Sequence, residues 1–176
     1  SVDCLRAAGG GTVVGIGQDA RRAPELWAAR TGESKARALT EVNRAVGQLT
    51  IGRTSTIEWG STEGLSIEGL LTLPPGFKPG APYPTVLIVH GGPAGRFRTD
   101  VGLAPRQLLA AQGYVVLSPN PRGSSGYGES FLMGNVRDWG GGDYRDLMAG
   151  LDHLIEKGIA DPERLGIYGA SYGGYM

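Results

Sequence analysis

The sequence predicts an α/β fold with an incomplete, mostly parallel sheet, preceded by a short all-β segment. Residues 85–89 form an apolar run after Thr85, which is typical of a strand buried on both faces of a parallel sheet, and residues 114–118 predict a second buried strand. A stretch with helical periodicity follows each of these runs. A third short run, residues 164–168, leads directly into a Gly-x-Ser-x-Gly pentapeptide at residues 169–173. This alternation of strands and helices indicates part of a parallel α/β sheet.

The first 50 residues contain short candidate strands separated by turns. The candidates are residues 12–17, 25–30 and 36–40, with a Thr-Gly turn over residues 31–34. A helix over residues 24–30 is the alternative, because Ala, Leu and Glu favour a helix and proline suits its first turn. Several short strands in a row indicate one blade of an all-β array, although one blade does not establish a repeat.

Beyond residue 52 the pattern changes to longer elements. Residues 56–59 and 65–73 flank a glycine-rich turn and predict a β-hairpin. Residues 74–84 carry five prolines and two glycines, which predicts a loop. Helices are predicted over residues 105–112 and 144–157, and each is followed by a glycine that ends it. The second helix places four apolar residues on one face: Leu147, Leu151, Leu154 and Ile155.

Composition excludes some classes of partner. Seventeen basic residues balance seventeen acidic ones, so neither nucleic acid nor an anionic membrane is expected as the main partner. No apolar run approaches the ~20 residues that span a bilayer, and residues 1–4 show no start of a signal peptide. The lone cysteine, Cys4, forms no intrachain disulfide and leaves the compartment open. We expect no metal and no cofactor, and a cytoplasmic location is favoured over a periplasmic or secreted one.

Ser171, in Gly169-Ala170-Ser171-Tyr172-Gly173, is the candidate nucleophile. A nucleophilic serine must be exposed, with a base beside it and donors for the developing oxyanion. In the Gly-x-Ser-x-Gly elbow, the serine is exposed on a turn between a strand and a helix. This turn is so sharp that the residues two positions before and two positions after the serine must be small. Gly169 and Gly173 occupy those positions, and Gly174 gives the turn further conformational freedom. The alternative is a tight glycine turn whose serine only hydrogen-bonds locally.

The segment His90-Gly91-Gly92-Pro93 follows the first buried strand. In hydrolases with this elbow, the loop after that strand donates one backbone N–H to the oxyanion hole, and the residue after the serine donates the other. That residue is Tyr172 here. Gly91 and Gly92 would let the backbone approach a reacting carbonyl, while an ordinary β-turn is the alternative. His90 precedes the serine, whereas the catalytic order is Ser, acid, His, so we expect it to orient the loop. His153 is interpreted as a helix residue without a catalytic role.

A competing motif lies earlier in the chain. Residues 15–20 fit the G-x-G-x-x-A fingerprint of dinucleotide-binding proteins after a candidate strand. That fingerprint requires a helix next, whereas residues 21–24 introduce a proline and residues 31–34 a turn too soon. We therefore do not expect a dinucleotide site.

Five motifs in order resemble one known family. They are residues 90–93, 113–116, 120–128, 161–167 and 169–176. Together they resemble the prolyl oligopeptidase family over residues 20–176, and within it the acylaminoacyl-peptidase and dipeptidyl-peptidase branch. The resemblance implies the last strands of a β-propeller over residues 1–52 and the first part of an α/β-hydrolase catalytic domain over residues 53–176.

The same resemblance implies a serine peptidase that acts through an acyl-enzyme on Ser171. The backbone N–H groups of Gly92 and Tyr172 would form the oxyanion hole. The enzyme would cleave peptides or release N-terminal (acyl)aminoacyl or dipeptidyl groups, and the choice between exopeptidase and endopeptidase stays open. Arg122 would shape the site, and its pairing with a buried acid is preferred to any chemical role. Two alternatives stay open: a carboxylesterase or lipase with the same fold, and a binding protein that keeps an inactive hydrolase scaffold.

In that family the catalytic acid and histidine lie well downstream of the serine. The acidic candidates Asp143, Asp146 and Asp161 all precede Ser171, and neither histidine is well placed. We therefore expect this chain to be an internal fragment, inactive alone, with the triad Asp and His beyond Met176. The sequence does not determine the oligomeric state.

Overall fold

The computed structural model describes residues 2–176, which divide into two compact units. The first unit runs to Thr50 and includes Thr99–Gly102. The second unit comprises Ile51–Arg98 and Leu103–Met176. The assignment of residues 1–52 to a propeller and 53–176 to a hydrolase domain stays a prediction, and each unit is described by itself below.

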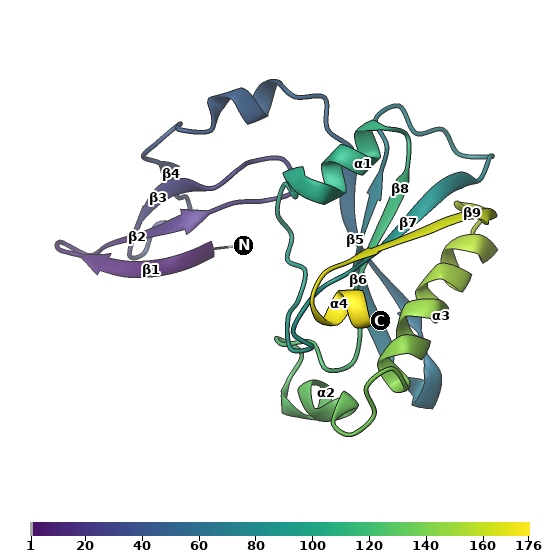
Figure 1. Cartoon of the computed structure of the whole chain (residues 1–176). Helices are drawn as coiled ribbons and strands as arrows, with labels where there is room; N and C mark the ends of the chain where they lie inside the picture. The colour runs from purple at the N-terminus through teal and green to yellow at the C-terminus, as the bar shows by residue number, and fades with distance from the viewer. Residues whose placement is uncertain (1) are drawn as a thin grey trace. The chain divides into compact units, whose positions relative to one another are not determined.

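The first unit is a four-stranded antiparallel sheet in the order β1-β2-β3-β4, drawn in purple and blue in Figure 1. Its strands are β1 (Val2–Ala8), β2 (Thr12–Gly17), β3 (Glu25–Arg30) and β4 (Arg37–Ala38). The strand prediction for residues 25–30 is confirmed, and the helix alternative is wrong. All six β3 residues pair with β2, so cross-strand hydrogen bonds outweigh the local helix propensity of Ala and Leu. The sequence pattern missed β1.

The dinucleotide fingerprint at residues 15–20 falls on a β-hairpin. It covers the end of β2 and the turn into β3, where the Asp19 carboxylate accepts the backbone N–H groups of Arg21 and Arg22 at 2.9 and 2.8 Å. No helix follows β2, so the phosphate-binding geometry of that fingerprint is absent from this hairpin.

The second unit contains a five-stranded sheet in the order β5-β6-β8-β7-β9 (Figure 1). Its strands are β5 (Arg53–Gly60), β6 (Ser66–Leu73), β7 (Tyr83–Val89), β8 (Val115–Asn120) and β9 (Ala160–Gly169). The strands β8, β7 and β9 are parallel, whereas β5 pairs antiparallel with β6, and β6 with β8. The sheet is therefore mixed. The predicted hairpin joins the parallel strands, so the expectation of a mostly parallel sheet holds only for β8-β7-β9.

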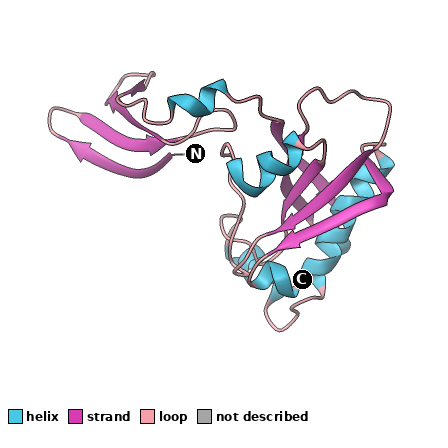
Figure 2. Ribbon diagram, turned by 45° about the horizontal axis from the view of Figure 1, so that its top comes forward, coloured by secondary structure: helices cyan, strands magenta, loops and turns pink. Residues whose placement is uncertain are grey.

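Helices cover both faces of this sheet, as Figure 2 shows in cyan against magenta. They are α1 (Leu108–Ala111), α2 (Glu129–Leu132), α3 (Gly142–Glu156) and α4 (Tyr172–Tyr175). On one face, Leu147, Leu151 and Leu154 of α3 pack in a core with Leu87, Val89 and Leu117. On the other face, Val86, Ile88 and Val116 pack with Leu109 of α1. Successive strand residues point to opposite faces, which is why residues 86–89 had to be apolar throughout.

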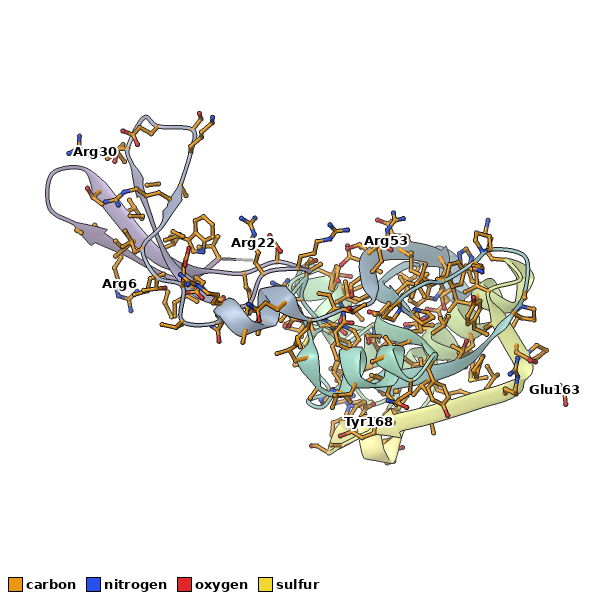
Figure 3. All side chains as sticks on the ribbon, turned by 90° about the horizontal axis from the view of Figure 1, so that it is seen from above. Arg6, Arg22, Arg30, Arg53, Glu163 and Tyr168 are labelled. Atoms are coloured by element: carbon orange, nitrogen blue, oxygen red, sulfur yellow. The ribbon has the colours of Figure 1, made fainter. Side chains whose placement is uncertain are left out.

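β9 is an edge strand of the described sheet. It pairs with β7 on one side, and no strand within residues 2–176 pairs with its other side. Tyr168 lies on it near the point where the chain enters the Ser171 turn (Figure 3), and its neighbour Ile167 is 61% exposed. β9 thus carries the candidate nucleophile to the carboxyl end of the sheet, where ligands bind in open α/β folds.

Candidate active site

The register between β7 and β9 brings the two sequence motifs together. The strands are parallel, and Val89 lies opposite Gly169 at their carboxyl ends. The two segments that follow these strands leave the sheet side by side, one at His90 and the other at Ala170. A Cβ placed on Gly91 would lie 3.4 Å from Ser171 Cβ and 3.8 Å from Ser171 Oγ. Two segments 80 positions apart in the sequence therefore meet at one point, with Gly91 directly beside the serine.

Ser171 lies on a sharp turn between β9 and α4. Its backbone has φ 57° and ψ −124°, a conformation that non-glycine residues seldom adopt and that persists only where the surroundings impose it. A Cβ on Gly169 would come within 2.0 Å of Gly173 O, and one on Gly173 within 2.2 Å of Val89 O. A Cβ on Gly174 would be 3.5 Å from Gly169 O, an ordinary contact. The turn therefore requires glycine at 169 and 173, but has room for a methyl group at 174.

His90 is held in the loop after β7 by both ring nitrogens. Nδ1 lies 2.9 Å from Gly91 O, and Nε2 lies 3.0 Å from Ser124 Oγ. The ring also meets Phe97 edge to face at 5.4 Å. Burial lowers the pKa of His90, and the hydrogen bond to Gly91 works in the opposite direction. His90 thus leaves no ring nitrogen for Ser171, and its contacts are those of a group that orients the loop.

No other described side chain is placed as a base for Ser171. Ser171 is exposed, and within residues 2–176 its Oγ has no hydrogen-bond partner. His153 lies in the last turn of α3, while Asp143 and Asp146 are buried at its start and bonded to other groups. Asp161 pairs with Arg164 at 2.6 Å. The arrangement therefore offers an exposed serine beside the Gly91 loop, and no described side chain is placed as its base.

Two buried polar residues at the site have contacts that the sequence did not predict. Asn120, at the end of β8, accepts from Phe97 N at 2.7 Å and donates to Phe97 O at 3.0 Å, so it holds the loop after β7 like a strand partner. It also donates to Tyr127 Oη at 2.7 Å. Burial, with the nearby Glu68, raises the pKa of Tyr127 to about 12. The second residue, Asp143, accepts a hydrogen bond from the Tyr172 phenol. The pairing of Asn120 with Phe97 and that of Asp143 with Tyr172 join residues 23 and 29 positions apart, which no local pattern indicates.

Arg122 forms a buried ion pair with Asp146, which confirms the predicted pairing with a buried acid. Its Nε and Nη2 donate to the two carboxylate oxygens of Asp146 at 2.9 and 2.8 Å, and its Nη1 reaches Glu63 at 2.8 Å. Arg122 is 4% exposed and Asp146 is fully buried. The Asp146 hydrogen bonds raise the pKa of Arg122 above its usual value, so the guanidinium stays charged. Arg122 thus links the loop after β8 to α3, and its side-chain hydrogen bonds go to Asp146, Glu63 and Thr62.

We expect Arg122→Met to destabilise the second unit by about 3–5 kcal/mol, because it leaves the buried Asp146 carboxylate without its partner. Urea denaturation midpoints check this. Arg164→Met is the matched control, since Arg164 forms an exposed pair with Asp161 and such pairs contribute little. Adding Asp146→Asn to Arg122→Met should recover part of the loss, and equal midpoints for wild type and Arg122→Met would contradict the expectation.

The described residues lack two further kinds of feature. Within residues 2–176, no group of three or more His, Cys, Asp or Glu side chains could hold a metal ion. No helix in the same range has the length and apolar character to cross a membrane.

Comparisons with known proteins agree with this geometry. The model of the prolyl oligopeptidase family matches residues 102–176. The uncharacterized peptidase YuxL of Bacillus subtilis is 35% identical over 156 residues, which is 88% of this chain and 24% of YuxL. Dipeptidyl aminopeptidase BIII of Pseudoxanthomonas mexicana is 37% identical over 125 residues, 68% of this chain and 18% of that protein. A solved acylaminoacyl peptidase, in complex with Z-Gly-Gly-Phe-chloromethyl ketone, has a TM-score of 0.87 and 31% identity.

That structure aligns with 99% of this chain, whereas this chain covers 28% of it. The chain thus spans less than a third of the length of the relatives it matches. The family match includes β8, α3, β9 and the Ser171 turn. The motifs, the strand order and these similarities agree: residues 102–176 match the prolyl oligopeptidase family, and the chain is similar to peptidases over most of its length.

Proposed function

We propose that Ser171 is the nucleophile of a serine peptidase and that the backbone N–H groups of Gly92 and Tyr172 form its oxyanion hole. The observation that carries the proposal is the meeting of Gly91 and Ser171, 3.8 Å from Oγ to the Cβ position of Gly91. The exposed hydroxyl on a strained turn supports the proposal, and so does the position of Gly91 in the loop after β7, beside the serine. A carbonyl carbon over Ser171 Oγ would direct its oxygen toward these N–H groups.

The proposed reaction has two steps on Ser171. In the first, Oγ bonds to the substrate carbonyl carbon, its proton passes to a histidine base, and the carbonyl oxygen becomes an oxyanion held by the two N–H groups. The C–N bond then breaks, the amine leaves with the proton from the histidine, and an ester on Ser171 remains. In the second step, water attacks this ester and gives a proton to the histidine; the bond from the acyl carbon to Oγ then breaks, Oγ takes that proton back, and the acid leaves.

We propose that the substrate is a peptide and that (acyl)aminoacyl or dipeptidyl groups are released from its N-terminus. The names of the relatives support this class, because one is a dipeptidyl aminopeptidase and the acylaminoacyl peptidase binds a tripeptide-like chloromethyl ketone. We further propose that residues 1–52 end a propeller, that residues 53–176 begin the hydrolase domain, and that the acid and the histidine come from outside this chain. The 176 residues alone should then be inactive.

Labelling with a fluorophosphonate probe tests the proposal in the full-length protein. We expect the probe to modify Ser171, as located by mass spectrometry of the digested protein, and the 176-residue chain alone to stay unlabelled. We also expect aminoacyl or dipeptidyl anilides to be hydrolysed in preference to short acyl esters. Labelling at another serine would contradict the nucleophile, a preference for esters would indicate an esterase, and no hydrolysis of either would indicate a binding protein.

A further inference from the structure

We infer that Asp143 is a positioning residue for the oxyanion hole, because its buried carboxylate holds the Tyr172 phenol and thereby orients the Tyr172 backbone N–H beside Ser171. This inference rests on the proposed function, since the N–H matters only if an oxyanion forms there. It adds a residue on α3 that does not touch the substrate.

Asp143 is a fully buried carboxylate whose partners are all neutral donors. Burying a carboxylate is unfavourable unless hydrogen bonds replace the lost water. Its four donors within the described residues are Asn135 Nδ2 at 3.2 Å, Gly140 N at 3.0 Å, Tyr144 N at 2.9 Å and Tyr172 Oη at 2.5 Å. Asp143 is also the second residue of the fifteen-residue helix α3, where the helix dipole favours negative charge. Three of these four donors do not belong to Tyr172, so the carboxylate is held in place independently of it.

Two contacts hold the Tyr172 side chain. The phenol donates to Asp143 Oδ2, and the ring meets Trp139 edge to face at 5.4 Å. Burial raises the pKa of Tyr172, and the hydrogen bond to Asp143 adds to this, so the phenol stays a donor. Tyr172 also directly follows Ser171, whose backbone is strained, so a contact that holds the Tyr172 side chain acts next to the turn.

The phenol and the N–H belong to the same residue, so fixing one restricts the other. An oxyanion donor acts only when it lies ~2.7–3.1 Å from the oxyanion, and an error of ~1 Å reduces the rate by about 10²-fold. The anchor is rigid because α3 packs in the core through Leu147 and Leu151. The contact between Asp143 and Tyr172 thus transfers the rigidity of α3 to the turn that carries the nucleophile.

Tyr172→Phe in the full-length enzyme tests the inference. We expect kcat to fall about tenfold while KM changes less than about twofold, because the N–H is needed more in the transition state than in substrate binding. A peptide aldehyde forms a tetrahedral adduct on Ser171, so its inhibition should weaken by the same factor as kcat/KM. Tyr175→Phe is the matched control, since Tyr175 is 64% exposed and donates only to Trp139 O at 3.3 Å. It should behave like the wild type.

A second variant shows whether Asp143 acts through Tyr172. Asp143→Asn should lower kcat. The double variant with Tyr172→Phe should be no more impaired than the worse of the two single variants, because both substitutions act on the same contact between Asp143 and Tyr172. If Tyr172→Phe leaves kcat and aldehyde inhibition unchanged while Ser171→Ala is inactive, the positioning inference is overturned and the proposed function stands. The inference would also be overturned if Tyr172→Phe raised KM enough to account for the whole fall in kcat/KM. Full activity of Ser171→Ala would overturn both.

Discussion

Replacing Ser171 by alanine is expected to lower kcat by about 10⁴–10⁶-fold in the full-length protein, the range found when a serine nucleophile is removed from an enzyme with an intact oxyanion hole. The physical reason is that alanine has no atom to form the acyl-enzyme, so water must attack the carbonyl directly. Steady-state hydrolysis of a dipeptidyl anilide measures the effect. KM should change little, because the substrate contacts stay in place.

Ser124→Ala serves as the control for that substitution. Ser124 is fully buried, its hydroxyl lies 3.0 Å from His90 Nε2, and it donates to Pro121 O at 2.6 Å. Its loss should disturb the orientation of His90 and reduce activity far less than the loss of Ser171. Activity of Ser171→Ala within tenfold of wild type would show that another residue is the nucleophile.

Replacing Gly173 or Gly169 by alanine is expected to destroy the elbow. The new Cβ would lie 2.2 Å from Val89 O in the first case and 2.0 Å from Gly173 O in the second. Both contacts are with backbone, which cannot rotate away as a side chain can. We expect each variant to lose about 3 kcal/mol or more of stability and, where it folds, about 10²-fold in kcat/KM through misplacement of Ser171.

Gly174→Ala makes the same chemical change one residue further on. Its Cβ would sit 3.5 Å from Gly169 O, and alanine favours helix, so stability should stay equal or rise slightly. Thermal denaturation and kcat/KM of the three variants give the comparison. A Gly173→Ala variant as stable and active as Gly174→Ala would contradict the space argument at the turn.

The strands and helices of the second unit could largely be predicted from local patterns. Residues 86–89 are all apolar because β7 is covered on both faces, and α3 has leucines three and four apart because one of its faces is buried. The elbow at Ser171 was also readable, since its chemistry requires small residues at fixed spacing. These features depend on neighbours in sequence, which is why a pattern carries them.

Other features depended on tertiary contacts. The hairpin β5–β6 was predicted, but its position beside β8 follows from pairing between strands more than 40 residues apart. The strand at residues 25–30 was ambiguous because Ala and Leu favour a helix, and pairing with β2 decided it. β1 was missed because its residues show no clear alternation, and all but one of them are exposed.

The sequence alone determined which residue is the candidate nucleophile and which loop could serve it, because each requirement is local. Only the tertiary structure decided that these segments meet, since the parallel register of β7 and β9 sets Gly91 beside Ser171. It also decided the partners of the buried charges: Asp146 binds Arg122, and Asp143 binds Tyr172. A buried charge must find its donors wherever the fold brings them, and those donors lie 24 and 29 positions away in the chain.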